Sequence, residues 1–498
     1  MNTKALRQKV LDLAIHGKLV PQNPNDESAT VLLEKIRAEK AEKIKKGELK
    51  ADKKDSFIFV GSDKRHYEQF ADGTVKDIED EIPFDVPKEW AWCRLTNVAI
   101  TELGKTLDAK KNKGESYDYL CALNVKWYTF DFTTLKQIRL EEKEKERYLV
   151  RKGDLLICEG GDVGRSAIWE SDNPIYYQNA LHRVRFYQNI NQYFFLHVLN
   201  YYKNIGLIDD VSGGVTIKHF TQNSMQKLLF PLPPLAEQER IVSVIKNIFS
   251  QIDTLDQNKS DLQTAIKQTK SKILDLAIHG KLVPQDPTDE PAEELLKRIA
   301  TSDNRPYKKF EGEVPFDIPE SWIWMKIPDL CTISIKDGTH KTPTYADKEN
   351  GIPFLSSKDV ISGKIDWSKI KYITKELHEE LYKRIAPQKN DILLAKNGTT
   401  GVAALVEDDT IFDIYVTLAV IRPDCDIVNP QYLLFIINSQ FCKNQFDSHL
   451  LGIGVPNLHL NEINKTSVPI PPLAEQQRIV SKIEELFSYL DTLSSNLE

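Results

Sequence analysis

The sequence predicts an α+β protein, in which long antiparallel coiled-coil helices join two globular α/β domains. From Ile241 to Leu276, nine of the eleven positions at alternating four- and three-residue steps are apolar, the heptad pattern of a coiled coil. Residues 231–255 recur with few changes at 469–493, and residues 274–285 recur without a mismatch at 11–22. We therefore expect circularly permuted repeats related by a pseudo-twofold axis.

The central helix is expected to run from Pro233-Pro234 to His279-Gly280. Proline is typical of a helix start and glycine of a helix end. An ordinary amphipathic helix on a globular core is the alternative, but the 3.5-residue period persists over five heptads, which favours a coiled coil.

The two ends of the chain together cover nearly all of the central helix. By the repeats, the C-terminus ends opposite residue 260 and the N-terminus begins opposite residue 264. We expect the two terminal helices to abut and to pair with the central helix as one split rod. The alternative is a tandem duplication whose ends are frayed and unrelated in space; it would leave two apolar seams exposed.

Two further repeats mark the domain boundaries. The sequence PFDVPKEWAW at 83–92 matches PFDIPESWIW at 315–324, and each suits the first strand of a domain. The predicted divisions are a helical region with a linker, a first globule, a central helical region, a second globule and a C-terminal helix, at 1–80, 81–232, 233–312, 313–470 and 471–498.

The segment before the first globule is rich in charge. We expect a helix at 28–46 and an irregular linker or insertion at 47–80. Its lysine-rich run is interpreted as a solvated face, with contact to DNA phosphate or to a partner as the alternative.

The two globules share a few landmarks. Residues 150–170 and 387–407 each predict a strand, a glycine-rich turn and a second strand, and helices are expected at 190–203 and 429–443. Glycine turns follow at 212–215 and 452–455. Elsewhere the globules differ, a pattern that predicts a bipartite reader with a constant frame and unlike contacts.

Composition sets outer limits on function. The chain has 498 residues, a net charge of −7 and six scattered cysteines, which we interpret as reduced thiols of a cytoplasmic protein. No run approaches the roughly 18 apolar residues of a membrane span. The net charge alone argues mildly against nucleic acid, although it does not describe local faces.

Catalytic motifs are absent from the sequence. Residues 160–166 resemble a phosphate loop only faintly, because the spacing is short and arginine replaces lysine. Asp154 and Asp391 match in position, and each is interpreted as a turn residue that opens a strand. His16 and His279 also match, as residues at helix ends. We predict no catalytic residue and no metal site.

The repeated blocks PPLAEQ-x-RIVS, LDLAIHGKLVPQ and PFD(V/I)P-x-x-W resemble those of the specificity subunit of type I restriction-modification systems, over the whole chain. In the second globule, 337–343 (DGTHKTP) and 351–356 (GIPFLS) are similar to a pattern common in the target-recognition domains of that family. The first globule lacks this pattern.

The resemblance implies a function and a set of partners. Each target-recognition domain would read one half of an asymmetric split site in double-stranded DNA, and the paired helices would set the spacer between the halves. Two methyltransferase subunits would bind S-adenosylmethionine and methylate adenine at N6, and restriction subunits would use ATP and Mg²⁺. This chain would itself hold no cofactor and no catalytic residue.

Polar residues in the turns of the globules are the candidate DNA contacts, since lysine and arginine suit guanine or phosphate, and asparagine and glutamine suit adenine. The candidates are Lys105, Thr106, Asn124, Lys126, Arg165, Gln178, Asn179, Thr216, Lys218 and His219 in the first globule, and Thr339, His340, Lys341, Thr342, Ser356, Ser357, Lys358, Lys396, Asn397 and Thr399 in the second.

Two other functions stay open from the sequence. A coiled-coil scaffold would recruit proteins without reading DNA, and a DNA gel shift with the methyltransferase partner distinguishes it. A fused restriction-methylation enzyme is disfavoured by the missing cofactor motifs, and a methylation assay on this chain alone tests it.

Overall fold

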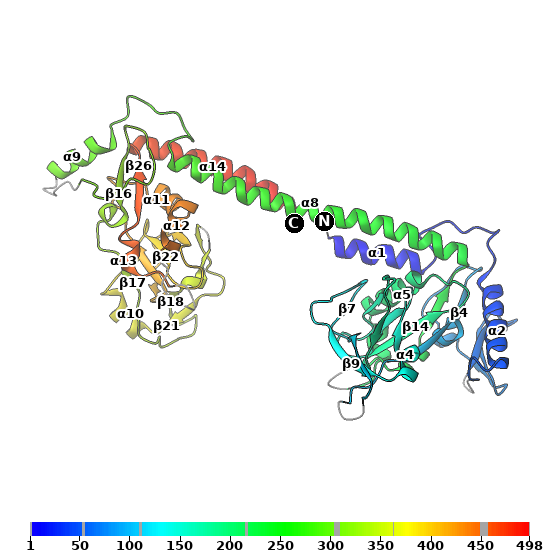
Figure 1. Ribbon diagram of the computed structural model, residues 1–498. Helices are drawn as coiled ribbons and strands as arrows, with labels where there is room; N and C mark the ends of the chain where they lie inside the picture. Colours follow the sequence, from blue (N-terminus) through cyan, green and yellow to red (C-terminus); the bar gives the residue numbers. More distant parts are fainter. Residues whose placement is uncertain are drawn as a thin grey trace. The chain divides into compact units, whose positions relative to one another are not determined.

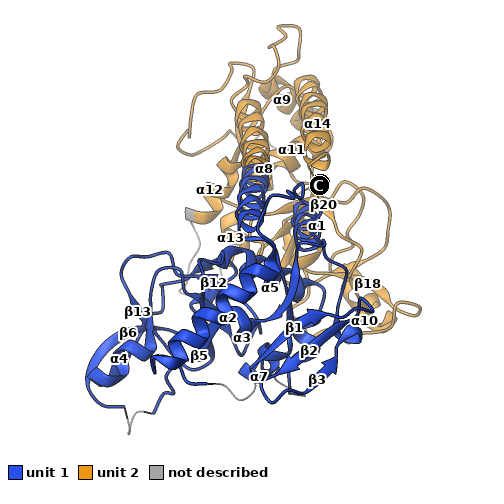
Figure 2. Cartoon of the chain, turned by 90° about the vertical axis from the view of Figure 1, so that its right-hand side faces the viewer, with its two compact units in different colours: residues 1–257 blue, residues 258–498 orange. Residues whose placement is uncertain are grey.

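The computed structural model describes residues 2–51, 55–108, 112–214, 218–302, 309–361, 363–448 and 457–497. The chain divides into two compact units, Met1–Gln257 and Asn258–Glu498, referred to here as unit 1 and unit 2 (Figure 2). No helix in the described part of the chain is long and apolar enough to cross a membrane.

The predicted central helix is α8, Leu235–Ile278 (Figure 1). It begins directly after Pro233-Pro234, and Gly280 follows its last turn with a φ of +66°, so both predicted ends are confirmed. The short helix α1, Thr3–Ile15, ends in the same way before Gly17, whose φ is +65°. His16 and His279 each bond through Nδ1 to a carbonyl of the preceding turn, as expected of helix-end residues.

Each unit packs one end of α8 against a shorter helix. In unit 1, Leu11 and Ile15 of α1 share a core with Ile241 and Ile245 of α8. In unit 2, the core takes in residues 273–278 of α8 together with α14, Leu473–Ser495. Salt bridges join the same helices, Arg7 to Asp253 at 2.6 Å in unit 1 and Lys270 to Asp491 at 2.5 Å in unit 2.

The heptad seam is buried at its two ends only. Ile252 and Ile266 are buried, but Leu255 and Leu262 between them are 45% and 41% exposed. The helices α1 and α14 share cores with the two outer parts of α8. The predicted junction of the chain ends involves Met1 and Glu498, which lie outside the described residues.

The helices of unit 1 besides α1 and α8 are α2 Ala29–Lys45, α3 Leu95–Val98, α4 Glu142–Tyr148, α5 Gln192–Asn204, α6 Leu207–Val211 and α7 Gln222–Lys227. Its strands are β1 Ser56–Val60, β2 His66–Phe70, β3 Val75–Asp77, β4 Ala91–Arg94, β5 Ala99–Leu103, β6 Glu115–Leu120, β7 Val125–Lys126, β8 Thr129–Phe130, β9 Lys136–Leu140, β10 Leu149–Val150, β11 Leu155–Cys158, β12 Ser166–Ile168, β13 Ile175–Tyr177, β14 Leu181–Phe186 and β15 Leu229–Leu232.

The globule of unit 1 contains two four-stranded sheets, ordered β12-β11-β14-β5 and β10-β13-β6-β9, and the pair β15-β4. Residues 155–158 and 166–168 form the predicted strand, turn and strand. The predicted helix at 190–203 is α5, whose many buried aromatic side chains fill the core beside the first sheet.

The remaining helices of unit 2 are α9 Ala292–Ser302, α10 Lys375–Tyr382, α11 Pro430–Ile437, α12 Gln440–Ser448 and α13 Leu460–Ile463. Its strands are β16 Ile323–Lys326, β17 Lys336–Asp337, β18 Ile352–Leu355, β19 Val360–Ile361, β20 Lys364–Ile365, β21 Lys371–Ile373, β22 Ile392–Ala395, β23 Ala403–Leu405, β24 Asp413–Ile414, β25 Leu418–Ile421 and β26 Ser467–Ile470.

Unit 2 repeats the arrangement of unit 1. Its sheet β17-β25-β22-β23 corresponds to β5-β14-β11-β12, and β16-β26 corresponds to β4-β15. The registers also agree, since Leu155 faces Val184 in unit 1 and Ile392 faces Ile421 in unit 2. The helix predicted at 429–443 is divided into α11 and α12, with a break at Asn438-Ser439.

The prediction of an irregular linker at 47–80 is wrong for most of its length. A three-stranded sheet, β1-β2-β3, spans residues 56–77. Arg94 of β4 binds this sheet through a buried ion pair with Glu68 at 2.8 Å. The run Ser56-Phe-Ile-Phe-Val60 is a strong strand former, but the surrounding charged residues concealed it in the sequence.

Candidate nucleic-acid interface

The three repeated motifs meet at one buried cluster in each unit, which we call the junction. In unit 1, Glu237 of PPLAEQ accepts hydrogen bonds from Trp90 Nε1 at 3.0 Å and from Gln22 Nε2 at 2.6 Å. A side chain at Gly17 would collide with Pro87, so glycine is required here both by space and by its positive φ. The junction thus connects α8 to the globule and to the segment after α1.

The junction of unit 2 has the same contacts. Glu475 accepts from Trp322 Nε1 at 2.9 Å and from Gln285 Nε2 at 2.6 Å, and Gly280 lies against Pro319. Burial raises the pKa of Glu475, as it raises that of Glu237 in unit 1. The residues that carry the sequence resemblance therefore build the attachment of each globule to its helices.

Replacing Glu237 with alanine is expected to destabilise unit 1 by about 1–3 kcal/mol, because the buried Trp90 indole N–H loses its acceptor. Glu475→Ala should have a similar effect on unit 2, because the Trp322 indole N–H also loses its acceptor. Hydrogen exchange measured separately over the two units checks this. Glu237→Gln, which retains an acceptor oxygen, is the control; equal losses for Ala and Gln would contradict the role of the hydrogen bond.

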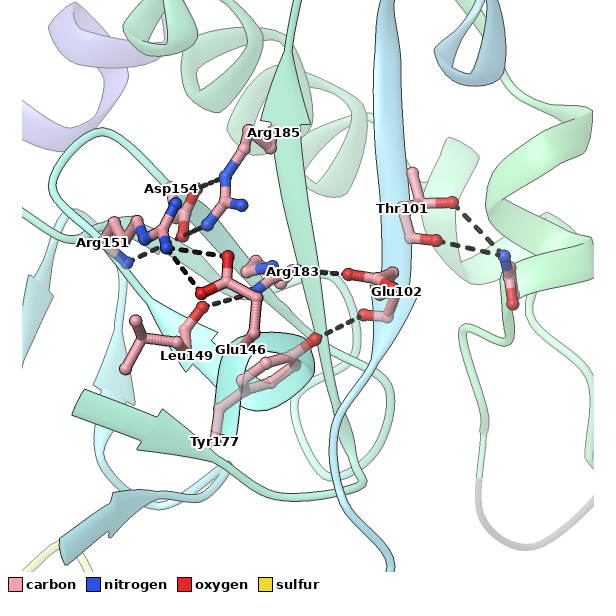
Figure 3. Close-up of polar contacts among 10 residues, drawn as sticks. Thr101, Glu102, Glu146, Leu149, Arg151, Asp154, Tyr177, Arg183 and Arg185 are labelled. Atoms are coloured by element: carbon pink, nitrogen blue, oxygen red, sulfur yellow. Dashed lines mark hydrogen bonds and ion pairs between the residues drawn. The ribbon is translucent and has the colours of Figure 1, made fainter. Parts of the chain in front are cut away.

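The matched aspartates close turns, as predicted, and each buried carboxylate also binds a partly buried arginine. Asp154 accepts from the Arg151 backbone N–H at 2.8 Å and from Arg185 Nε and Nη2 at 2.7 Å each (Figure 3). Asp391 accepts from Arg422 Nε at 2.7 Å in the same way. Figure 3 also shows Arg183 between Glu102 and the Leu149 carbonyl. Arg183 and Arg185 of β14 are thus engaged within the fold.

Four candidates of unit 1 lie together at the end of β5. Lys105 bridges to Gln178 through the backbone, and Asn179 Nδ2 donates to Thr106 Oγ1 at 3.4 Å. Lys105 is buried and pairs with Glu144 of α4. Among these four, the Thr106 side chain is the exposed one.

The other candidates of unit 1 are dispersed. Asn124 is fully buried and closes a loop, accepting from the Cys121 N–H and donating to the Asp131 carbonyl. Arg165 donates to the Ala122 carbonyl at 2.7 Å. The exposed candidates here are Lys126, Lys218 and His219, while Thr216 lies outside the described residues.

Unit 2 brings three of its candidates into one polar hollow of about 500 Å³. Lys396 is buried there and donates to Asp337 Oδ2 at 2.7 Å. His340 lies 3.3 Å from the same carboxylate, and Arg384 donates to its other oxygen at 3.0 Å. Burial alone would raise the pKa of Asp337, but its neighbours, Lys396 above all, hold that pKa below its usual value.

The hollow also contains residues that the sequence did not single out. Its lining consists of Asp337, His340, Lys396, Asn397, Val416, Asn457, His459, Leu460 and Asn461. Asn457 pairs with Asn397 as an isolated bridge, which places a distant segment beside the candidates. The sequence of 457–461 has no periodic pattern. Only its alignment with the repeat at 219–223 could have identified this segment as part of the site.

The other candidates of unit 2 divide between buried and exposed. Thr339 and Ser357 are buried, and Ser356 caps a turn by bonding to Asp359. Thr399 is exposed and donates through Oγ1 to the Ser357 carbonyl at 3.1 Å. The remaining candidates, Lys341, Thr342 and Lys358, are exposed. Among the described residues, no group of three or more His, Cys, Asp or Glu is placed to hold a metal ion.

Each unit thus combines the same junction with polar side chains that differ between the units. The family described as "Type I restriction modification DNA specificity domain" matches residues 87–264 and 319–498. The chain belongs to this family. It is the DNA specificity subunit of a type I restriction-modification system, the non-catalytic component of such enzymes.

Individual relatives agree with this assignment. The EcoAI specificity subunit of Escherichia coli is 27% identical, and the match covers 98% of this chain and 90% of that protein. The EcoEI specificity subunit of Escherichia coli is 24% identical, over 99% of this chain and 91% of that protein. A solved structure concerned with complex assembly and conformational transition of the type I R-M system has the same fold, with a TM-score of 0.58 at 17% identity, over 83% of this chain and 94% of that one.

Proposed function

We propose that each unit reads one half of a split, asymmetric site in double-stranded DNA. The target-recognition domains of this proposal are residues 81–232 and 313–470. One observation carries it: the junction is repeated contact for contact, whereas the polar candidates of the two globules differ, as Glu159 and Lys396 do at one equivalent position. A repeated frame with unlike faces suits two unlike half-sites, because base edges in the groove carry the sequence information.

The exposed candidates are the side chains that we propose to touch DNA directly. Buried candidates such as Asn124, Thr339 and Ser357 are proposed to shape the loops that present them. Direct contacts are proposed for Thr106, Lys126, Lys218, His219, His340, Lys341, Thr342, Lys358 and Thr399.

We further propose that the paired helices form an antiparallel coiled coil that sets the distance between the half-sites. The support is that α1 and α14 each share a core with their own end of α8. In this proposal the repeats are circularly permuted, and the chain ends complete one split rod. The helices also dock two methyltransferase subunits, which methylate adenine with S-adenosylmethionine, and restriction subunits join the full complex.

Sequencing the methylated bases of DNA exposed to the complex with methyltransferase subunits tests the proposal. We expect one bipartite motif. Inserting one heptad after Gln257, in the exposed middle of α8, should lengthen the spacer by about 10 Å, or about three base pairs, and leave the half-sites unchanged.

The same seven residues inserted after Gly73, in the turn between β2 and β3, are the control, for which the spacer should stay as it is. Altered half-sites after the α8 insertion would contradict the spacing role. The scaffold alternative predicts no sequence-dependent shift of DNA by the complex in a gel, with or without the insertion.

A further inference from the structure

Glu159 of unit 1 and Lys396 of unit 2 occupy equivalent backbone positions and carry opposite charges. The Glu159 N–H donates to the Ala180 carbonyl at 2.9 Å, and its own carbonyl accepts from the Phe220 N–H at 2.8 Å. The Lys396 N–H donates to the Thr417 carbonyl at 2.8 Å, and its carbonyl accepts from the Leu458 N–H at 2.9 Å. Each residue directly follows one of the matched strands β11 and β22. The two side chains therefore extend from equivalent positions of the backbone.

In unit 2 the lysine has a partner within the fold. Lys396 Nζ donates to the buried carboxylate of Asp337, and both side chains line the polar hollow. The lining also includes the side-chain amides of Asn397, Asn457 and Asn461, which are able to donate hydrogen bonds. Lys396 was a candidate from the sequence, but its counterpart Glu159 was not.

In unit 1, the described residues provide no such partner for Oε2 of Glu159. Oε2 of Glu159 and both ring nitrogens of His182 are buried without a hydrogen bond of good geometry in the described part of the chain. The two side chains lie 3.5 Å apart, and His182 is 1% exposed. The Glu159 side chain keeps 18% of its surface exposed and thus borders solvent.

His182 does not neutralise Glu159 near neutral pH. Burial lowers the pKa of His182 to about 4, so the imidazole is uncharged at pH 7. Burial raises the pKa of Glu159, with His219 as the opposing influence. An unpaired buried carboxylate costs free energy, and a carboxylate facing DNA phosphates is also repelled. Both costs are offset when the carboxylate accepts a hydrogen bond from a group on the DNA.

We propose that Glu159 determines specificity in unit 1 by accepting a hydrogen bond from the exocyclic amino group of cytosine or adenine in the major groove. Cytosine N4 and adenine N6 are the amino donors that the major groove offers, whereas guanine offers acceptors at O6 and N7. Lys396 occupies the equivalent point of unit 2, where it donates to Asp337. The inference rests on the proposed reading of DNA by both units.

The test uses the full chain with its methyltransferase partners and sequencing of methylated bases. Glu159→Lys, which gives unit 1 the residue of unit 2, should change the preference at one position of one half-site from cytosine or adenine to guanine, by about tenfold or more. Glu159→Gln should weaken the preference at that position. Binding to duplexes with each base at that position measures the change.

Asp172→Asn is the matched control, because it removes one negative charge at a position 87% exposed in the same unit. It should raise affinity for all duplexes slightly and leave the motif unchanged. The inference is overturned if all three variants methylate the original motif, in which case the reading of DNA by the units still stands. Absence of sequence-specific methylation by the unaltered complex would overturn both. Thermal unfolding confirms that each variant is folded before its motif is compared.

Discussion

Acidification from about pH 7 to pH 5 is expected to destabilise unit 1 by several kcal/mol more than unit 2. Two buried histidines of unit 1 are responsible. Burial lowers the pKa of His197 to about 3 and that of His182 to about 4. The equivalent positions of unit 2 hold Phe435 and Ala419, which do not titrate.

The direction of the effect follows from proton uptake on unfolding. Both histidines have a lower pKa in the folded chain than the unfolded value of about 6.5, so below that pH the unfolded state binds more protons. Stability is full above about pH 6.5 and declines as the pH falls toward the folded values, by about 2 kcal/mol for each histidine at pH 5. The raised pKa values of Glu237 and Glu475 act in the opposite direction but affect both units.

Hydrogen exchange of the full chain at pH 7 and pH 5 measures the two units separately. His197→Phe, which introduces the residue of unit 2, should reduce the excess acid sensitivity of unit 1 by about half. Because Tyr128 Oη lies 3.2 Å from His197 Nδ1, the variant is best combined with Tyr128→Phe. Equal acid sensitivity of the two units would contradict the assignment.

Replacing Asp391 with alanine is expected to destabilise unit 2 by about 3–5 kcal/mol, because it leaves a largely buried arginine without its counter-charge. Asp391 is fully buried and binds Arg422 through Nε at 2.7 Å and Nη2 at 2.8 Å. It also accepts from the Gln388 N–H at 2.9 Å, so the turn before β22 is weakened as well.

Chemical denaturation followed by hydrogen exchange over each unit measures this loss. Asp154→Ala should produce a similar loss in unit 1, through Arg185. Asp408→Ala, which removes an exposed turn aspartate after β23, is the control and should cost about 1 kcal/mol or less. A loss for Asp391→Ala as small as that of the control would show that the buried pair contributes little.

The features that were predictable from the sequence are those encoded locally or by repetition. Pro233-Pro234 and Gly280 fixed the ends of α8, since neither residue type suits a helix interior. The repeats identified which residues of the two units correspond, and the structure then assigned them their contacts at the junction. The duplicated turn aspartates were recognised for the same reason.

Features that depend on distant contacts were missed. Arg185 and Arg422 lie about 30 residues from their aspartates, and no local pattern links them. Heptad spacing predicted an apolar seam, but the exposure of Leu255 and Leu262 depends on where the partner helices end. Asn124 was chosen as an amide in a turn, and only the fold shows that both ends of that amide are occupied. Glu159 lies directly before the glycine-rich turn at 160–166, and only the fold shows that it corresponds to Lys396.

The sheet β1-β2-β3 makes unit 1 different from unit 2. It is fastened to β4 by Arg94, where unit 2 carries Lys326, and the described residues between α9 and β16 contain no strand. In the proposed docking of two methyltransferase subunits, one subunit would meet this extra sheet and the other would not. A titration with that subunit should then resolve a stronger and a weaker binding step.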